Sequence, residues 1–301
     1  MTDLTPLCAQ QARDLGESPA GTAPADTEHW IVLQSQAPWA RKAWPSLPVP
    51  DDVRAHIDGA MAQVGRARLQ LIRRSAARDD GTVTLYVGRS TPGRQALYRY
   101  RLSDLSEALE IDLAGLMSGD SDDPAARWGE PLLLVCTHGT RDRCCARWGA
   151  PLVRALEPLL GDALWSASHV GGHRFAPNLL ALPLGALYGH LDPDDAPALA
   201  EALKAGRLPG GDTLRGRTCY DRPTQAAEAF LCQESRIEDL NAVTLVEAAR
   251  ADGDDAWTAV FEVEGRRREV RVAQRALDAA QAASCGDTPK PGTTFALVAI
   301  T

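Results

Sequence analysis

The order of the apolar segments limits the possible folds of this chain most strongly, because the same order occurs twice. The first set comprises an apolar run at 29–34, a helical pattern at 51–64, alternating runs at 68–73, 82–88 and 96–101, and a helix from Ser103 to Met117 with Ser103 as its cap. The second set lies at 131–135, 145–160, 163–168, 179–184, 186–190 and 193–205, the last segment capped by Asp192. Both sets give the order β-α-β-β-β-α, which predicts an α/β (α+β) chain built on thioredoxin-like units that lack one helix. The shared order leaves an internal duplication open.

The segments around these two sets divide the chain into four predicted regions. Residues 1–28 are rich in Pro, Gly, Ala and Asp without a periodic pattern, which predicts an extended N-terminal arm. Residues 29–118 are predicted as a thioredoxin-like half without ligands, and 127–210 as a second thioredoxin-like domain. Residues 211–301 are predicted to form a small α+β region. It would consist of a basic turn from 215, a helix at 223–231 and strands at 243–249, 256–263, 269–273 and 294–300.

Charge and apolar patterning exclude several classes of protein. Forty acidic and 32 basic residues give a net charge of −8, which argues against a general nucleic-acid or anionic-membrane binder. The sequence has no run of 18 uncharged apolar residues, and its first thirty residues are charged where a signal peptide would be apolar. We therefore expect a soluble, cytoplasmic protein. In such a protein seven cysteines do not indicate a disulfide framework, and a cluster of Cys and His indicates a metal or redox site.

Two short segments carry most of the chemical information. The first, C-T-H-G-T-R-D-R-C-C-A-R-W-G at 136–149, begins where an apolar strand ends and finishes inside the next helix. Free backbone N–H groups at a helix N-terminus favour a thiolate over a thiol. The second, H-V-G-G-H at 169–173, follows another strand. If these strands are parallel neighbours, both segments lie at the same edge of the sheet.

Two thiolates and two imidazoles can hold either zinc or a two-iron cluster. Eight residues separate Cys136 from Cys145, which is too long for a zinc knuckle and favours a loop around a larger group. Gly171 and Gly172 would let the backbone approach such a cofactor. These features favour the cluster. The remaining residues of both types are interpreted as structural: His29, His56, His138 and His190, the lone cysteines Cys8, Cys219, Cys232 and Cys285, and one of the pair Cys144 and Cys145.

The motifs C-T-H-G-T-R-D-R-C-C-A-x-x-G and H-V-G-G-H-R-F-A-P-N-L-L-A-L-P-L-G-x-L-Y-G resemble the sucrase/ferredoxin-like family, whose core is similar to the thioredoxin-like 2Fe-2S ferredoxins. The resemblance covers most of the chain, including G-E-S-P-A-G-T-A near the N-terminus and R-G-R-T at 215–218, and it is sharpest at 131–190. In these ferredoxins a small residue and a glycine follow the second cysteine, which implies Cys145 rather than Cys144. His169 and His173 occupy the place of the second cysteine pair. The resemblance therefore implies a 2Fe-2S cluster held by Cys136, Cys145, His169 and His173, with a Rieske-like donor set.

The resulting hypothesis is a soluble 2Fe-2S protein that transfers electrons, with reduction coupled to protonation, and that acts as a carrier rather than a catalyst. Its redox partner would be a reductase or a flavoprotein, and it would bind neither nucleic acid nor membrane. The side chains expected to hydrogen-bond around the ligands are Arg141, Asp142, Arg174 and Asn178. Two alternatives stay open. They are a thiol-based oxidoreductase that uses Cys144–Cys145 or Cys136, and a zinc-stabilised interaction module.

Overall fold

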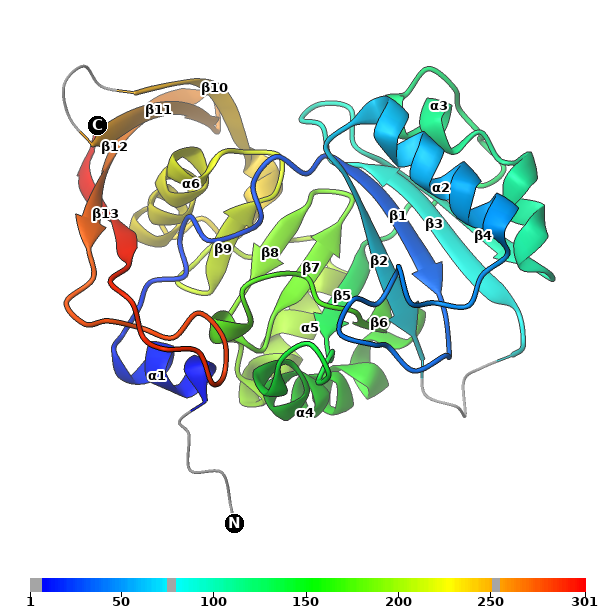
Figure 1. Cartoon of the computed structure of the whole chain (residues 1–301). Coiled ribbons are helices and arrows are strands. Elements are labelled where there is room, and N and C mark those ends of the chain that lie inside the picture. Colours follow the sequence, from blue (N-terminus) through cyan, green and yellow to red (C-terminus); the bar gives the residue numbers. More distant parts are fainter. Residues whose placement is uncertain (1–6, 75–79, 251–254) are drawn as a thin grey trace, which may run out of the picture.

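The protein contains one large mixed sheet covered by helices and one smaller antiparallel sheet (Figure 1). The computed structural model describes residues 7–74, 80–250 and 255–301. The large sheet has nine strands in the order β4-β3-β1-β2-β6-β5-β7-β8-β9. These strands are β1 (His29–Gln34), β2 (Ala67–Arg73), β3 (Val83–Arg89), β4 (Ala96–Leu102), β5 (Leu132–Cys136), β6 (Leu164–Ala167), β7 (Leu179–Leu182), β8 (Ala186–Tyr188) and β9 (Leu214–Arg217).

The two halves of the large sheet have the same topology. In the first half β1 pairs parallel with β2 and antiparallel with β3, and β3 continues to β4. In the second half β5 pairs parallel with β6 and antiparallel with β7, and β7 continues to β8. The halves join where β2 pairs antiparallel with β6. The expected α/β fold class is confirmed, and the repeated order of elements corresponds to a repeated pattern of strand pairing.

Helices connect the parallel strands in both halves, as parallel pairing requires. The crossover helices are α2 (Asp51–Val64) and α4 (Arg143–Leu160), and α5 (Ala196–Lys204) closes the second half after a 3₁₀ turn at Pro193–Asp195. The strand β5 in the second half is entirely buried. Leu133 and Val135 face the core shared with α4, whereas Leu132, Leu134 and Cys136 face the opposite core. A strand covered on both faces is apolar at every position, which explains why β5 is a continuous apolar run.

Two predictions in the first 120 residues differ from the structure. The segment 103–117 is a 3₁₀ helix (Leu105–Glu110) followed by a short helix α3 (Leu113–Ser118), not one helix. Asp104 rather than Ser103 caps it, because the Asp104 carboxylate accepts from Ser106 N while Glu107 accepts from Asp104 N in a capping box. The predicted extended arm contains the helix α1 (Cys8–Asp14), whose three buried residues are Cys8, Ala9 and Ala12. The first six residues of that arm lie outside the described residues.

The C-terminal region adds a helix and a second sheet. Its elements are α6 (Arg222–Glu234) and the strands β10 (Val243–Arg250), β11 (Ala256–Val263), β12 (Arg266–Ala276) and β13 (Thr293–Ile300), which pair in this order. The predicted basic turn at 215 is wrong. It is the strand β9, which pairs with β8 and extends the large sheet. Arg217 of β9 is buried because it forms an ion pair with the buried Glu228 of α6.

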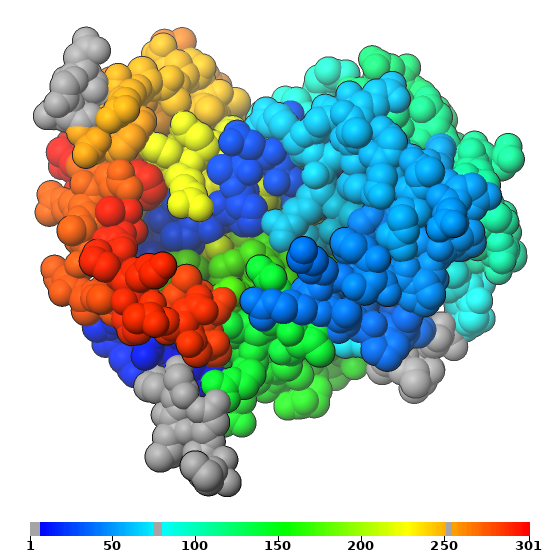
Figure 2. Space-filling model, viewed as in Figure 1, coloured from blue at the N-terminus to red at the C-terminus, as the bar shows by residue number. Residues whose placement is uncertain are grey.

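The segment between β12 and β13 returns from the small sheet to the side of α1 and α4 (Figures 1 and 2). None of the helices in the described ranges is long and apolar enough to span a membrane. The division into an arm, two halves and a C-terminal region stays a prediction, as do the cytoplasmic location and the absence of nucleic-acid binding.

Candidate metal centre

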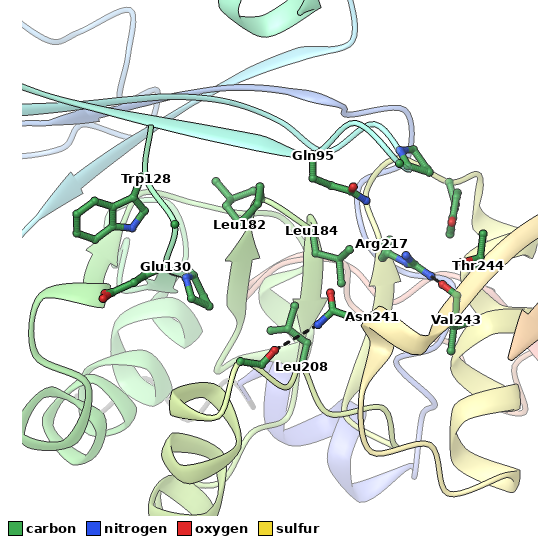
Figure 3. A pocket seen from close by; sticks show the side chains of 17 residues that line it. Gln95, Trp128, Glu130, Leu182, Leu184, Leu208, Arg217, Asn241, Val243 and Thr244 are labelled. Atoms are coloured by element: carbon green, nitrogen blue, oxygen red, sulfur yellow. Dashed lines mark hydrogen bonds between the residues drawn. The ribbon is translucent and has the colours of Figure 1, made fainter. Parts of the chain in front are cut away.

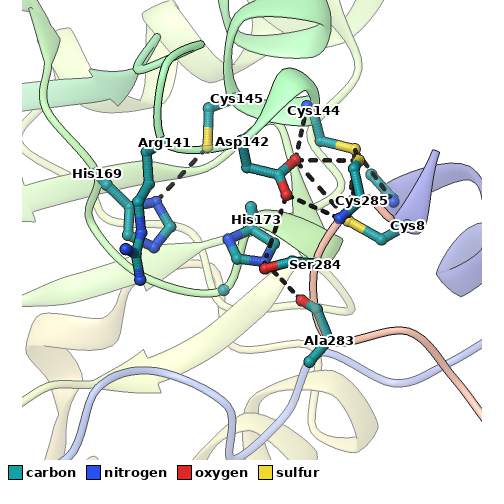
Figure 4. A network of polar contacts seen from close by, with 12 residues as sticks. Cys8, Arg141, Asp142, Cys144, Cys145, His169, His173, Ala283, Ser284 and Cys285 are labelled. Atoms are coloured by element: carbon teal, nitrogen blue, oxygen red, sulfur yellow. Dashed lines mark hydrogen bonds and ion pairs between the residues drawn. The ribbon is translucent and has the colours of Figure 1, made fainter. Parts of the chain in front are cut away.

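Cys136, Cys145 and His169 lie together at the edge of the sheet where β5 and β6 end, and Figure 4 shows Cys145 and His169 there. The two strands are parallel neighbours, with Cys136 opposite Ala167, so their carboxyl ends bring both motif segments to the same edge. One ligand atom from each of the three side chains lies within 4.8 Å of the others. The Sγ of Cys145 is 3.6 Å from the Nδ1 of His169. Both cysteines are buried, whereas His169 is partly exposed.

The start of α4 positions the cysteines through its cap and its small residues. Asp142 caps the helix by accepting a hydrogen bond from Cys144 N at 2.9 Å. A Cβ on Gly139 of the preceding loop would lie 2.9 Å from the Cβ of Ala146, and a Cβ on Gly149 would lie 2.0 Å from the carbonyl oxygen of Cys136. The C-A-x-x-G pattern therefore allows the loop and the strand to pack directly against the helix.

The pKa values of the two buried thiols are shifted in opposite directions. The pKa of Cys136 lies well below its ordinary value because Cys145 donates to its sulfur and His169 adds a second favourable contact. The same contact with Cys136, together with burial, raises the pKa of Cys145. Burial lowers the pKa of the nearby Arg215 to about 9, and the charge of the Cys136 thiolate opposes that shift. The site thus combines sulfur ligands with buried positive charge.

His173 lies next to this group and has one ring nitrogen without a hydrogen-bond partner among the described residues. Its Nε2 is 2.8 Å from Ser284 Oγ, is held by the carbonyl oxygen of Ala283, and lies 3.6 Å from Asp142 Oδ2. Its Nδ1 is buried and has no hydrogen-bond partner among the described residues. The rings of His169 and His173 are 5.2 Å apart, and Figure 4 shows the His173 ring between Ser284 and the His169 ring. Burial also lowers the pKa of His173, which favours the neutral ring. An imidazole held at one nitrogen and free at the other is typical of a metal ligand.

Two arginines that the sequence analysis did not single out hold the loop between the histidines. Arg68 of β2 donates to the carbonyl of His169 at 2.8 Å, and Arg215 of β9 donates to the carbonyl of Gly171 at 2.9 Å. A Cβ on Gly172 would lie 2.1 Å from the Arg215 guanidinium. Contact with Arg215 and a φ of 65° account for glycine at position 172, and the approach of this backbone to a cofactor stays a prediction. The R-G-R-T segment is the sequence signal that points to Arg215.

The four side chains expected to surround the ligands have different roles. Asp142 is buried, where it caps α4 and faces the His173 ring. Asn178 accepts from Arg215 at 2.7 Å and donates to the Gly172 carbonyl, so it orders the loop. Arg174 forms an ion pair with Glu17 instead. The carbonyl of Arg141 accepts from Arg41, and, after burial, the charge of the Arg141 guanidinium helps to lower the pKa of His173.

His138 has the structural role that is expected of it. Its Nδ1 accepts from the backbone N–H of His169 at 3.2 Å, and its Nε2 is 3.0 Å from the carbonyl oxygen of Ala40. Both ring nitrogens are therefore engaged with the backbone, and the ring links the two motif segments.

The interpretation of Cys8 and Cys285 as isolated packing residues is wrong. Both lie beside Cys144 and Asp142 in a second group of potential ligands. Cys219 and Cys232 belong to neither group.

A separate cavity of about 450 Å³ lies near the beginning of β5, at the opposite end of that strand from Cys136 (Figure 3). Its lining includes Trp128, Leu182, Arg217 and Asn241, and it contains none of the predicted site residues.

Comparison with known proteins supports a single family. No curated protein matches the chain. One solved structure, a thioredoxin-like 2Fe-2S ferredoxin from Aquifex aeolicus, is similar to it with 18% sequence identity, covering 27% of this chain and 86% of that chain, at a TM-score of 0.24. The model of the sucrase/ferredoxin-like family matches residues 19–216, which is more than half of the chain. The chain therefore belongs to the sucrase/ferredoxin-like family.

Proposed function

We propose that this protein binds one 2Fe-2S cluster through Cys136, Cys145, His169 and His173 and functions in electron transfer. The observation that carries the proposal is the buried Nδ1 of His173, which lacks a partner in the described part of the chain and belongs to a ring next to that of His169. With the two buried thiols, it completes a set of two sulfur and two nitrogen donors. This is the donor set of a Rieske-type cluster.

The spread of the four donors limits how a single zinc ion or a cluster would fit the site. Zinc bonds of about 2.0–2.3 Å in a tetrahedron would bring all four donor atoms within about 4 Å of one another. Cys136, Cys145 and His169 meet a limit of 4.8 Å, but His173 does not join that group. One zinc ion held by all four residues would therefore require His173 to move, and a cluster with sulfur on one iron and nitrogen on the other would require the donor atoms of Cys145 and His169, which are 3.6 Å apart, to separate.

The residues of the site define how the cluster would be held. Deprotonated Cys136 and Cys145 would bind one side, and the neutral rings of His169 and His173 the other. When bound, the cluster would supply one-electron exchange. Neutral imidazoles in place of thiolates make the site less negative, and the buried guanidinium of Arg215 acts in the same direction. Both effects favour reduction, so we propose a potential well above that of an all-cysteine ferredoxin.

The partner would exchange electrons at the edge of the sheet where β5 and β6 end. His169 is the partly exposed member of the set, whereas His173 is buried behind Ala283 and Ser284. Electron transfer through the His169 side would give a reductase or flavoprotein the shortest path. The partner and the cytoplasmic location belong to this proposal.

Metal and acid-labile sulfide analysis of the purified protein tests the proposal, together with electron paramagnetic resonance after reduction. We expect a red-brown protein with two irons and two sulfides per chain. Cys145→Ser should lose the cluster, whereas the matched variant Cys144→Ser should keep it, because Cys144 points to the second cysteine group.

Other outcomes would favour the alternatives. A colourless protein with zinc bound by Cys136 and Cys145 would overturn the proposal in favour of the interaction module. A colourless, metal-free protein with reactive thiols would favour the oxidoreductase. Cluster loss in Cys144→Ser with retention in Cys145→Ser would reverse the ligand assignment.

A further inference from the structure

A second group of metal-binding side chains lies on the far side of Asp142 from His173 (Figure 4). Its three sulfur atoms form a triangle with Sγ–Sγ distances of 3.5 Å for Cys8–Cys144, 3.3 Å for Cys144–Cys285 and 3.7 Å for Cys8–Cys285. Asp142 Oδ1 lies 3.2 Å from the sulfur of Cys285 and 4.0 Å from that of Cys8. The four donor atoms therefore surround one small space.

Three distant parts of the chain contribute these donors. Cys8 comes from α1, Cys144 from the first turn of α4, and Cys285 from the segment between β12 and β13. Cys8 and Cys144 are fully buried beside Ala9 and Ala176, and Cys285 is partly exposed. Isolated thiols that only fill a core have no need to converge from three segments.

We propose that Cys8, Cys144, Cys285 and Asp142 bind one structural Zn²⁺ ion. Tetrahedral zinc with Zn–S bonds of about 2.3 Å places its sulfur ligands about 3.8 Å apart. The observed triangle is smaller by only a few tenths of an ångström, so small side-chain movements would admit the ion. All four ligands come from the protein, which is typical of a structural rather than a catalytic zinc site.

The position of Asp142 favours a cation over a disulfide. Its side chain is 2% exposed, and the groups that contact it are thiols, two backbone N–H groups and the His173 ring at 3.6 Å. A buried carboxylate without a fully charged partner is costly, and Zn²⁺ would neutralise it. A disulfide between any two of the cysteines would leave the carboxylate with hydrogen-bond donors but no cation, and would leave one thiol unused.

Zinc at this position would connect the termini to the proposed cluster site. It would hold α1 and the 277–292 segment against the start of α4. Because Asp142 Oδ2 faces the Nε2 of His173, the ion would also orient the carboxylate that lies behind that ring. The zinc site uses none of the four proposed cluster ligands, so the two sites can be tested separately.

Elemental analysis of the purified protein provides the first test. We expect one zinc per chain, retained when iron is present. Cys285→Ser and Cys8→Ser should each reduce the zinc content at least tenfold under dialysis against a mild chelator. Cys232→Ser is the matched control, because Cys232 is buried but lies outside both groups, and it should keep the zinc.

A second measurement uses the unaltered chain and does not depend on how the variants fold. Metal-free protein is treated with a maleimide with and without added Zn²⁺, and the labelled cysteines are mapped by peptide mass spectrometry. We expect Zn²⁺ to protect Cys8, Cys144 and Cys285 together. Failure to bind Zn²⁺, zinc retention in both cysteine variants, or a disulfide between two of the three cysteines would overturn the proposal. Zinc present without iron and sulfide would instead contradict the cluster proposal alone.

Discussion

Gly149 packs directly against the backbone of Cys136, so that a Cβ atom at position 149 would stand 2.0 Å from the carbonyl oxygen of Cys136. This contact brings the first turns of α4 against the end of β5, and it sets the separation between Cys136 and Cys145. The glycine of the C-A-x-x-G pattern therefore has a packing role, because the atoms nearest to its missing side chain belong to the backbone of Cys136 and Thr137.

Gly149→Ala should destabilise the protein by about 1–3 kcal/mol, because the added methyl group would push α4 away from the strand. It should also lower the metal content of the site. Gly59→Ala is the control, since Gly59 is likewise inside a helix but a Cβ at that position would have no heavy atom within 4 Å. That substitution should stabilise the protein by up to about 1 kcal/mol. Chemical denaturation measures both changes, and equal stability of the two variants would contradict the packing argument.

Replacing both histidines by cysteine tests their role as ligands. The variant His169→Cys/His173→Cys would restore an all-thiolate donor set. Its reduction potential should fall by hundreds of millivolts, on the order of the difference between Rieske and plant-type centres. Protein-film voltammetry measures the shift. A cluster that assembles with an unchanged potential would mean that neither histidine binds iron.

The reduction potential should depend on pH if the histidines bind the cluster, because each ligand ring has a second nitrogen that can carry a proton. The Nε2 of His173 is held by Ala283 and Ser284, whereas His169 is partly exposed and faces Cys145 with its Nδ1. Adding an electron makes the cluster more negative, which favours a proton on a ligand nitrogen that reaches solvent. The potential should therefore decrease with rising pH, by about 59 mV per unit where one proton accompanies each electron. A redox titration from roughly pH 5 to 10 checks this. A potential that does not change with pH would show that, in both histidines, the ring nitrogen that does not bind the cluster is buried or held by a hydrogen bond.

Folding stability should decrease in acid because of His190. Its two ring nitrogens are buried without hydrogen-bond partners in the described ranges, and burial, followed by the charges of Arg13, Arg215 and Arg174, lowers its pKa to about 4. An unfolded histidine titrates near 6.5, so the folded state binds fewer protons between these values. The free energy of unfolding is unaffected by His190 above about pH 6.5, and it decreases by up to about 3 kcal/mol as the pH falls towards 4.

His190→Asn tests this dependence, since His190 has a positive φ of 55° that asparagine tolerates. Urea denaturation at several pH values should give a flatter profile for the variant than for the unaltered protein. An identical slope between pH 6.5 and 4 would assign the acid sensitivity to other groups.

Local patterns in the sequence are sufficient to predict most regular elements. The strand at 29–34 and the helix at 51–64 agree with the structure to the residue, because a continuous apolar run is typical of a strand buried on both faces and helical periodicity reflects the buried face of a helix. The meeting of the 136–149 and 169–173 segments also follows from sequence, since parallel neighbouring strands place their carboxyl ends at one edge. The pattern does not identify Asp104 as the cap, because two adjacent polar residues could each cap the same turn.

Tertiary contacts decided the surroundings of the site. Cys8 and Cys285 are separated from Cys144 by more than 130 residues, and no local period predicts that such residues meet. The strand β9 is hidden in the sequence because its charged residues are buried, Arg217 against Glu228 and Arg215 against backbone carbonyls and Asn178. A charged side chain indicates an exposed position unless its partner is known, and here the partners come from other elements of the chain. Sequence alone therefore determined most of the elements and gave the predicted ligands, whereas only the folded chain determined which distant side chains surround them.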